Sequence, residues 1–94
     1  MPVINDVLVE KAQGTVSTAI GSEIVIMSAE SGFFCQVNRV GAAIWNLLEK
    51  PARVSELCQR LQDTFDVEPG ACLADVTEFL TSMQRLSMVR MSNS

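Results

Sequence analysis

The 94-residue sequence contains no histidine and no tyrosine. Histidine is the commonest general base and metal ligand in proteins, and tyrosine supplies the usual phenolic acid, so catalysis would depend on cysteine or on carboxylates. The five glycines are scattered along the chain and form no phosphate-binding loop. We therefore expect a protein that is not an enzyme, with no catalytic residues, no metal and no cofactor.

Cysteine is scarce, and its spacing does not suit metal binding, redox chemistry or nucleophilic catalysis. Cys35, Cys58 and Cys72 are an odd number without a C-x-x-C pair, and each falls on the apolar stripe of its segment. A nucleophilic cysteine needs a group that stabilises its thiolate, and the one nearby cation, Arg60, lies two positions from Cys58 and faces elsewhere on a helix. We expect reduced, buried thiols.

One pair of carboxylates remains. Asp75 and Glu78 are three residues apart and share a helix face, as a catalytic pair could. Exposed acidic positions on an amphipathic helix explain them equally well. We interpret them as surface residues, not as catalytic groups.

Basic residues are also few. Seven Lys and Arg stand against eleven Asp and Glu, for a net charge of −4, and no segment forms a basic patch, which opposes contact with nucleic acid. No apolar run approaches the roughly 18 residues of a membrane-spanning helix, and the N-terminus lacks the basic start of a secretory signal. We expect a cytoplasmic protein that contacts no membrane.

What is present is the composition of a globular domain, 48% apolar and 19% charged. The length suits one domain over residues 1–94 with one modest core. We expect the only tryptophan, Trp45, at the margin of that core. The first four or five residues look dispensable, and a disordered tail is expected at about 91–94.

Three short segments rich in Val, Ile and Thr predict an antiparallel meander. Residues 15–20 and 23–28 are joined by Gly21-Ser22, a two-residue connection typical of a type II′ hairpin. A second tight turn leads into residues 33–37. We expect residues 7–11 to extend the first strand or to lie beside it.

The periodicity changes at Asn38, whose side chain can cap a helix. Apolar residues then recur at helical spacing and predict helices over 39–49 and 54–65. A third, longer helix follows over 69–86, with proline suited to its first position. Residues 88–91 close as a short extended piece.

Strands followed by helices, without βαβ alternation, predict an α+β, winged-helix-like fold, with a three-stranded antiparallel sheet followed by three helices. Winged-helix proteins often bind DNA through the last helix. Here that helix carries only Arg85 against Glu68, Asp75 and Glu78. DNA binding is therefore the weaker alternative, because the phosphate-neutralising charge is missing.

The third predicted strand, residues 33–37, is the more informative feature. In a meander the last strand pairs only with the second, so its other edge stays open to an added strand unless a helix covers it. The strand carries no Lys and no Pro that would block such pairing. Two interpretations of its aromatic residues stay open: either Phe33 or Phe34 lines a groove beside a helix, or both only pack. The open edge also allows a homodimer.

A series of short motifs runs along the chain in a characteristic order. They are a Gly-aromatic strand ending in Val37-Asn38, VGAAIWNLL at 40–48, VSEL at 54–57, FDVEP at 65–69, and the pairs Asp75-Val76 and Phe79-Leu80. Together they resemble the PqqD-like family, named for coenzyme PQQ synthesis protein D and also called the RiPP recognition element. The resemblance extends from about Val16 to Val89.

The resemblance implies that the protein binds the leader segment of a ribosomally made precursor peptide. The leader would be added as a strand to the third strand, in the cleft against the third helix, and presented to a modifying enzyme. Carried over by position, the leader backbone would pair with Phe33, Phe34, Cys35 and Gln36. The third helix would offer Asp75, Phe79, Ser82 and Met83, and Asp75 with Glu78 would meet a basic or amide group.

The sequence departs from the family pattern at four positions. Phe34 and Cys35 stand where the family often has Tyr, Arg53 where it has Thr or Ser, and Gly70 where it has an acidic residue. The last two changes weaken the starts of two helices by several tenths of a kcal/mol each.

The aromatic strand and the Trp-bearing helix are similar to stand-alone members that serve lasso-peptide and related pathways. The enzyme partner would then be a leader peptidase, whereas a PQQ-type member would serve a radical SAM enzyme. A purely structural subunit of a larger biosynthetic enzyme is a third alternative.

Overall fold

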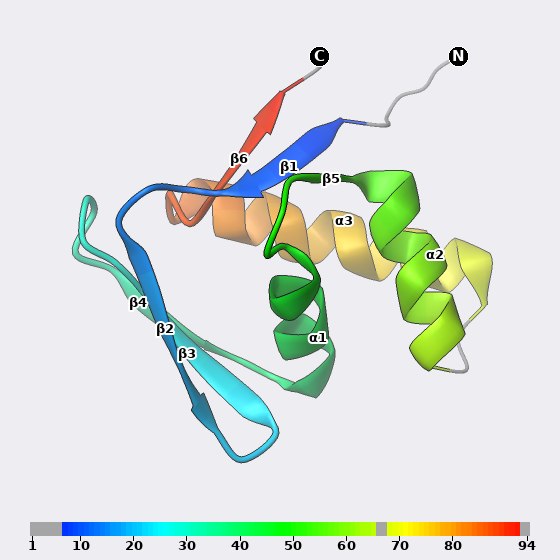
Figure 1. The fold of residues 1–94 in the computed structure, drawn as a ribbon, viewed down its shortest axis with the longest axis horizontal. Coiled ribbons are helices and arrows are strands. Elements are labelled where there is room, and N and C mark those ends of the chain that lie inside the picture. The colour runs from blue at the N-terminus through cyan, green and yellow to red at the C-terminus, as the bar shows by residue number, and fades with distance from the viewer. Residues whose placement is uncertain (1–6, 66–67, 93–94) are drawn as a thin grey trace.

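The computed structural model describes residues 7–65 and 68–92 (Figure 1). The elements follow in the order β1 (Leu8–Lys11), β2 (Thr15–Ile20), β3 (Glu23–Ser28), β4 (Phe34–Val37), α1 (Arg39–Leu47), β5 (Ala52–Arg53), α2 (Val54–Thr64), α3 (Pro69–Arg85) and β6 (Val89–Ser92). The predicted α+β class is confirmed, with three helices packed beside antiparallel sheets.

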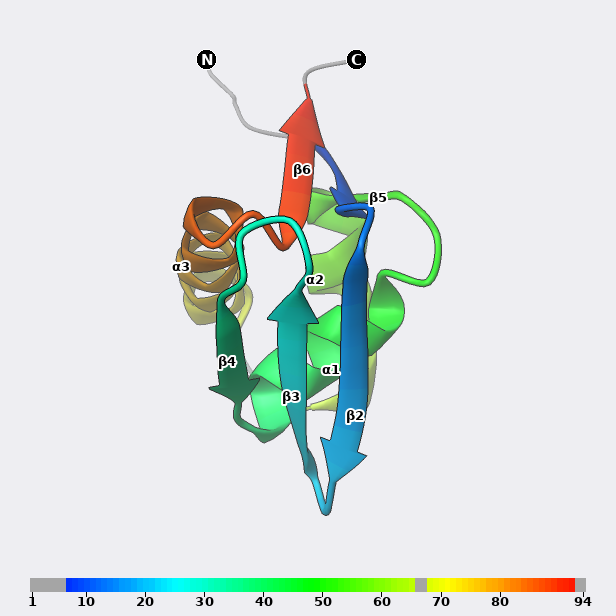
Figure 2. The same cartoon turned by 90° about the vertical axis from the view of Figure 1, so that its left-hand side faces the viewer.

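The predicted meander forms a three-stranded sheet in the order β2-β3-β4 (Figure 2). Its hairpin turns at Gly21, which has a φ of 64°, while Ser22 has no positive φ. This is the φ pattern of the type II′ turn that the sequence predicts. The second connection is held by Ser28, whose N–H donates to the Phe33 carbonyl at 2.9 Å, and by Ser31, whose hydroxyl donates to the Leu86 carbonyl of the α3 C-cap at 3.3 Å.

The prediction for residues 7–11 is wrong. The strand β1 lies in a second sheet, ordered β5-β1-β6, between two segments distant in the sequence. Val9 pairs with Ala52 on one side and with Met91 on the other, and it is completely buried. Such long-range pairing leaves no local periodicity that a sequence pattern could reveal.

The same sheet corrects the expected tail. Met91 and Ser92 belong to β6 and pair with Val9 and Leu8, so the chain is ordered into strand two residues further than expected. Residues 93–94 lie outside the described residues, as do the start of the chain and the Asp66-Val67 pair of the FDVEP motif.

The helices begin where the sequence predicts. Asn38 caps α1, and its Oδ1 accepts a hydrogen bond from the Gly41 N–H at 2.9 Å. The first N–H of α2, that of Val54, donates to the Val7 carbonyl at 3.2 Å. The backbone beside β1 thus accepts a hydrogen bond from the helix start, where Arg53 provides no side-chain cap. Among the described residues, no helix has the length and apolar character needed to cross a bilayer.

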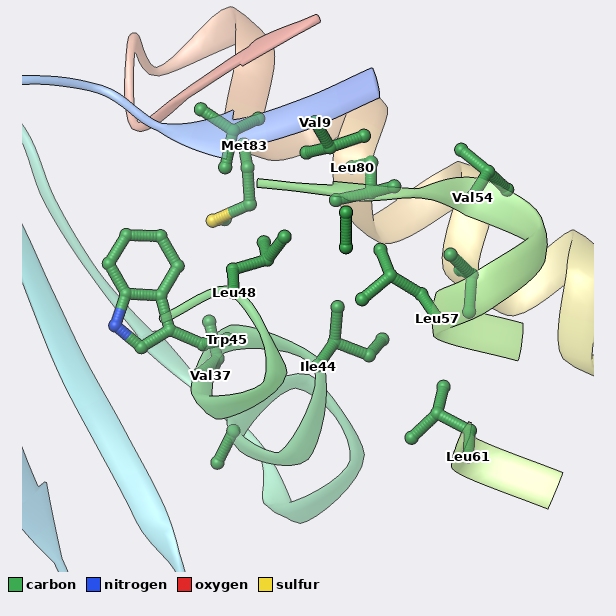
Figure 3. Packing of buried hydrophobic residues seen from close by; sticks show 14 of the residues in the cluster. Val9, Val37, Ile44, Trp45, Leu48, Val54, Leu57, Leu61, Leu80 and Met83 are labelled. Atoms are coloured by element: carbon green, nitrogen blue, oxygen red, sulfur yellow. The ribbon is translucent and has the colours of Figure 1, made fainter. Parts of the chain in front are cut away.

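The core lies between the two sheets and the three helices (Figure 3). Trp45 belongs to its centre and not to its margin, because only 2% of the residue is exposed. Its indole Nε1 donates to the Ser17 hydroxyl of β2 at 3.2 Å, and the Lys11 Nζ lies 4.6 Å from the ring centroid. The partial burial of Lys11 lowers its pKa, an effect that the nearby Glu49 carboxylate opposes.

The three cysteines are thiols, as expected. Cys58 and Cys72 are buried between α2 and α3, where the Cys72 Sγ donates to the Cys58 carbonyl at 3.6 Å. Cys35 is only half-buried, which corrects the expectation that all three are buried.

Candidate functional site

Within residues 7–65 and 68–92, no strand pairs with the outer edge of β4, as the meander predicts. β4 pairs with β3 through Ile24 with Val37 and Ile26 with Cys35. In an antiparallel pair the N–H and C=O groups of successive residues point alternately toward the partner and away from it. The bond from the Ser28 N–H to the Phe33 carbonyl sets this alternation, so Cys35 and Val37 point toward β3. The backbone groups of Phe34 and Gln36 therefore point to the open edge.

This alternation changes what was expected of Phe33. Its N–H donates to the Ser31 hydroxyl at 3.3 Å and its carbonyl accepts from Ser28, so both backbone groups serve the turn. Phe33 also precedes β4 and is not part of it. Of the four residues expected to pair with a leader, Phe33 and Cys35 have their backbone groups engaged, whereas Phe34 and Gln36 do not turn theirs to β3.

The side chains of β4 alternate as predicted. Val37 is buried and Cys35 half-buried, with the Cys35 Sγ 3.6 Å from the Met88 Sδ. Phe34 is 71% exposed opposite Met27, and Gln36 is exposed with its Nε2 donating to the Glu23 carboxylate of β3. Neither Phe33, 57% exposed, nor Phe34 is a core residue, so the interpretation that both only pack is wrong.

A cleft of about 470 Å³ opens where β4 passes into α1. One wall comes from the start of α1 and the other from α3, and the lining residues are Asn38, Val40, Gly41, Ile44, Asp75, Glu78, Phe79 and Ser82. A smaller apolar pocket of about 60 Å³ adjoins it and is lined by Val40, Leu61, Phe65, Cys72 and Asp75. The two share Val40 and Asp75, so they are neighbours on the same side of the domain.

Close packing of α1 against α3 sets the shape of the cleft. A Cβ added at Gly41 would lie 2.8 Å from the Phe79 Cε1 and 3.0 Å from the Val37 Cβ. Ordinary carbon–carbon contacts are about 3.5–4.0 Å, so only glycine allows this approach. Gly41 therefore holds the Phe79 ring against the end of β4, at the point where strand edge and cleft meet.

The cleft carries negative charge. Asp75 and Glu78 are both exposed on the α3 wall, and no Lys or Arg is among the residues that line the cleft. The closest basic residue along α1 is Arg39, whose guanidinium carbon lies 5.6 Å from the centroid of the Phe65 ring. A ligand with a cationic or amide group is therefore favoured over an anionic one.

The structure brings four of the five expected α3 residues together, namely Asp75, Glu78, Phe79 and Ser82. Met83 is the exception, because it is 4% exposed and packs in the core (Figure 3). The step of about 100° from Ser82 to Met83 carries the Met83 side chain past the edge of the cleft-facing stripe, toward the side of α3 that buries Val76 and Leu80. Met83 is thus not part of the cleft.

Sequence reasoning missed the α1 wall of the cleft. The sequence predicts a cap at Asn38 and an apolar stripe along the first helix, yet Val40 in that stripe is 40% exposed and both residues line the cleft. One signal of this wall was available in the sequence, namely the glycine at position 41 inside a predicted helix. A glycine at such a position often has a packing reason, because it lets another element come close to the helix backbone.

The site offers little for catalysis. Burial raises the pKa of the Cys35 thiol, which keeps it protonated and weakens it as a nucleophile. Within residues 7–65 and 68–92, no three His, Cys, Asp or Glu side chains gather as a metal site would require. The arrangement suits the binding of an extended chain along an edge and across a cleft.

Fold and site thus define a small winged-helix-like α+β domain with an open strand edge beside an acidic cleft. The family model of coenzyme PQQ synthesis protein D (PqqD) matches residues 23–89, and the chain belongs to this family. The match begins in β3, later than the Val16 expected from the motifs, and ends at the expected Val89.

A solved structure described as TbiB1 in complex with the TbiA(beta) leader peptide has the same fold. It matches with a TM-score of 0.78 and 24% sequence identity, over 86% of this chain and 94% of that chain. No curated protein sequence matches the chain.

Proposed function

We propose that this protein binds the leader segment of a ribosomally synthesised precursor peptide, without catalysing a reaction, and presents it to a maturation enzyme. The leader is added as an antiparallel or parallel strand to the open edge of β4, and its side chains enter the cleft between α1 and α3. The observation that carries the proposal is the unpaired edge at Phe34 and Gln36, directly beside that cleft. Family membership and the leader peptide in the TbiB1 complex support it.

The contacts follow from the geometry. The outward backbone groups of Phe34 and Gln36 provide the hydrogen bonds, and the exposed Phe34 ring covers one face of the added strand. Phe79 and the adjoining apolar pocket accept apolar side chains, while Asp75 and Glu78 accept a basic or amide group. Backbone pairing with two apolar contacts is sufficient for a micromolar dissociation constant, which corresponds to about −8 kcal/mol.

A proline substitution tests the backbone pairing itself. Gln36→Pro removes an N–H that points to solvent and not to β3, and proline is tolerated at such positions of edge strands. We expect the variant to fold and to lose at least about tenfold in leader affinity, or about 1.4 kcal/mol. The matched control is Ala19→Pro, which removes an outward N–H from the other edge of the same sheet and leaves leader affinity unchanged.

The measurement is an NMR titration of the labelled protein with synthetic leaders of precursor peptides encoded near its gene. Amide shifts are expected at residues 34–36 and along the cleft-facing side of α3 from 75 to 82. Silence of both regions at high micromolar peptide would refute the proposal. The same titration with duplex DNA at low salt is expected to give no shifts, because the α3 wall of the cleft is acidic.

The identity of the enzyme distinguishes the finer alternatives. A stand-alone member of the lasso-peptide type delivers its leader to a leader peptidase, whereas a PQQ-type member delivers it to a radical SAM enzyme. Addition of leader should strengthen co-elution with one of the two. A purely structural subunit would co-elute with its enzyme and bind no leader.

A further inference from the structure

The second open edge of the β2-β3-β4 sheet is β2, on the opposite side from β4 (Figure 2). β2 packs chiefly against β3, and every residue from Val16 to Ile20 is exposed. The strand has six residues and contains no charge, no proline and no glycine. Natural edge strands usually carry such features to prevent pairing with another chain.

The backbone groups of β2 alternate in a defined way. Ile20 and Glu23 flank the two-residue turn and therefore form a hydrogen-bonded pair, as does Gly14 with Ala29, whose N–H donates to the Gly14 carbonyl at 3.0 Å. Val16, Thr18 and Ile20 consequently point their N–H and C=O groups toward β3. Those of Ser17 and Ala19 point to the open edge.

We propose that β2 pairs antiparallel with β2 of a second copy of this chain, with Thr18 on the two-fold axis. In this register Ser17 of one copy and Ala19 of the other form hydrogen-bonded pairs on both sides of the axis. Thr18 faces Thr18 of the second copy as a non-hydrogen-bonded pair. The result is a continuous six-stranded sheet with β4 at each outer edge.

Side chains favour this register. Cross-strand partners share a face, so Val16, 62% exposed, lies opposite Ile20 of the second copy, 56% exposed. In each copy Met27 and Phe34 continue the row from Val16, because they are its cross-strand neighbours. Ile20 of the second copy extends this row across the interface, and the two-fold axis generates a second, identical row on the other side of the Thr18 pair.

Charge is compatible with a second copy. Residues 12–38 contain Glu23 and Glu30 and no Lys or Arg. Glu23 lies on β3, so in the proposed register both β2 strands stand between Glu23 of one copy and Glu23 of the other. The two glutamates also belong to different cross-strand rows. No two like charges therefore face each other, although each chain carries a net charge of −4.

The two edges differ in what they can recognise. β4 adjoins a cleft with carboxylates that can select a peptide by its side chains, whereas β2 offers an uncharged edge with small side chains at Ser17 and Ala19 on its core-facing side. An uncharged, self-complementary edge suits an identical strand. This inference does not depend on leader binding at β4.

Sedimentation velocity of the full chain tests the proposal over about two orders of magnitude in concentration, up to about 1 mM. We expect a reversible monomer–dimer equilibrium with a dissociation constant on the order of 10–100 µM, because the interface is small. Thr18→Lys should weaken it more than tenfold, since two lysines would meet at the closely spaced central pair. Gln59→Lys, an exposed change on α2, is the charge-matched control and should leave it unchanged.

A charge-swap experiment tests the register. Thr18→Lys and Thr18→Glu should each be monomeric alone, and their equimolar mixture should associate at least as tightly as the native protein. Net charge cannot explain this pattern, because Thr18→Lys makes the acidic chain less charged. A monomeric native protein at about 1 mM, an unaffected Thr18→Lys variant, or a mixture that stays monomeric would each overturn the proposal.

Discussion

Replacement of Gly41 by alanine tests how the cleft is built. Gly41 lies in the first turn of α1 without a positive φ, so the backbone conformation permits alanine. On helix propensity alone the change would stabilise the fold by up to about 1 kcal/mol. The tertiary structure predicts the opposite sign, because the added Cβ would approach the Phe79 Cε1 to 2.8 Å and the Val37 Cβ to 3.0 Å.

The size of the effect follows from these two contacts. The Val37 Cβ is fixed to the backbone of β4 and cannot rotate away, so α1 must shift or the Phe79 ring must turn into the cleft. Overpacking of this kind costs about 1–3 kcal/mol. After subtraction of the propensity gain, we expect Gly41→Ala to lower the free energy of unfolding by up to about 2 kcal/mol.

The assay is urea unfolding followed by the fluorescence of Trp45. Gly70→Ala is the matched control, since its added Cβ would meet nothing within 4 Å at the start of α3, and it should be neutral or stabilising. In a Phe79→Ala background the cost of Gly41→Ala should shrink by about 1 kcal/mol, because one of its two obstacles is gone. If Gly41→Ala stabilises the protein as Gly70→Ala does, or costs the same in both backgrounds, the reasoning is refuted.

Four further outcomes are expected. Phe34→Ala should change the free energy of unfolding by less than about 0.5 kcal/mol, because the ring is exposed, yet should weaken leader binding measured by calorimetry. Asn38→Ala should cost about 1 kcal/mol in urea unfolding, and Asn38→Asp should retain most of the cap. Ser17→Ala should cost about 0.5–1.5 kcal/mol by removing the part-buried hydrogen bond from the Trp45 N–H, an effect that should vanish in a Trp45→Phe background. Because the folded state raises the pKa of Cys35, the unfolded chain loses its thiol proton first, near the ordinary value of 9.0, and stability should fall as pH rises past that value. Urea midpoints at pH 7–10 should fall more steeply in the native protein than in Cys35→Ser.

The elements of the fold could be predicted because their signals are local. The Gly21 turn, the Asn38 cap and the strand periods of residues 15–28 each depend on residues close in the sequence. The position of β1 could not be predicted in this way, since its partners β5 and β6 lie at the middle and the end of the chain. Nor could the burial of Trp45, which requires β2 to lie across α1 so that Ser17 can accept its N–H.

The candidate site was predicted in part for the same reason. The open edge of β4 follows from the order of the meander and from the absence of Lys and Pro, and the stripe of Asp75, Phe79 and Ser82 was carried over by position from the family resemblance. Helical spacing alone did not separate Met83, which borders the same stripe but turns into the core. The α1 wall depends on the tertiary contact between Gly41 of α1 and Phe79 of α3, which no local pattern encodes.

The sequence by itself determined the main strand and helix segments, that the edge of residues 33–37 would lack blocking residues, and that general-base chemistry through histidine was excluded. Those properties are encoded in neighbouring residues and in composition. Only the tertiary structure decided that Phe34 and Gln36, and not Phe33, turn their backbone groups to the open edge, and that this edge meets an acidic cleft. The physical reason is that hydrogen-bond alternation and helix docking are fixed by pairing between distant segments, in which each contact depends on the placement of both partners.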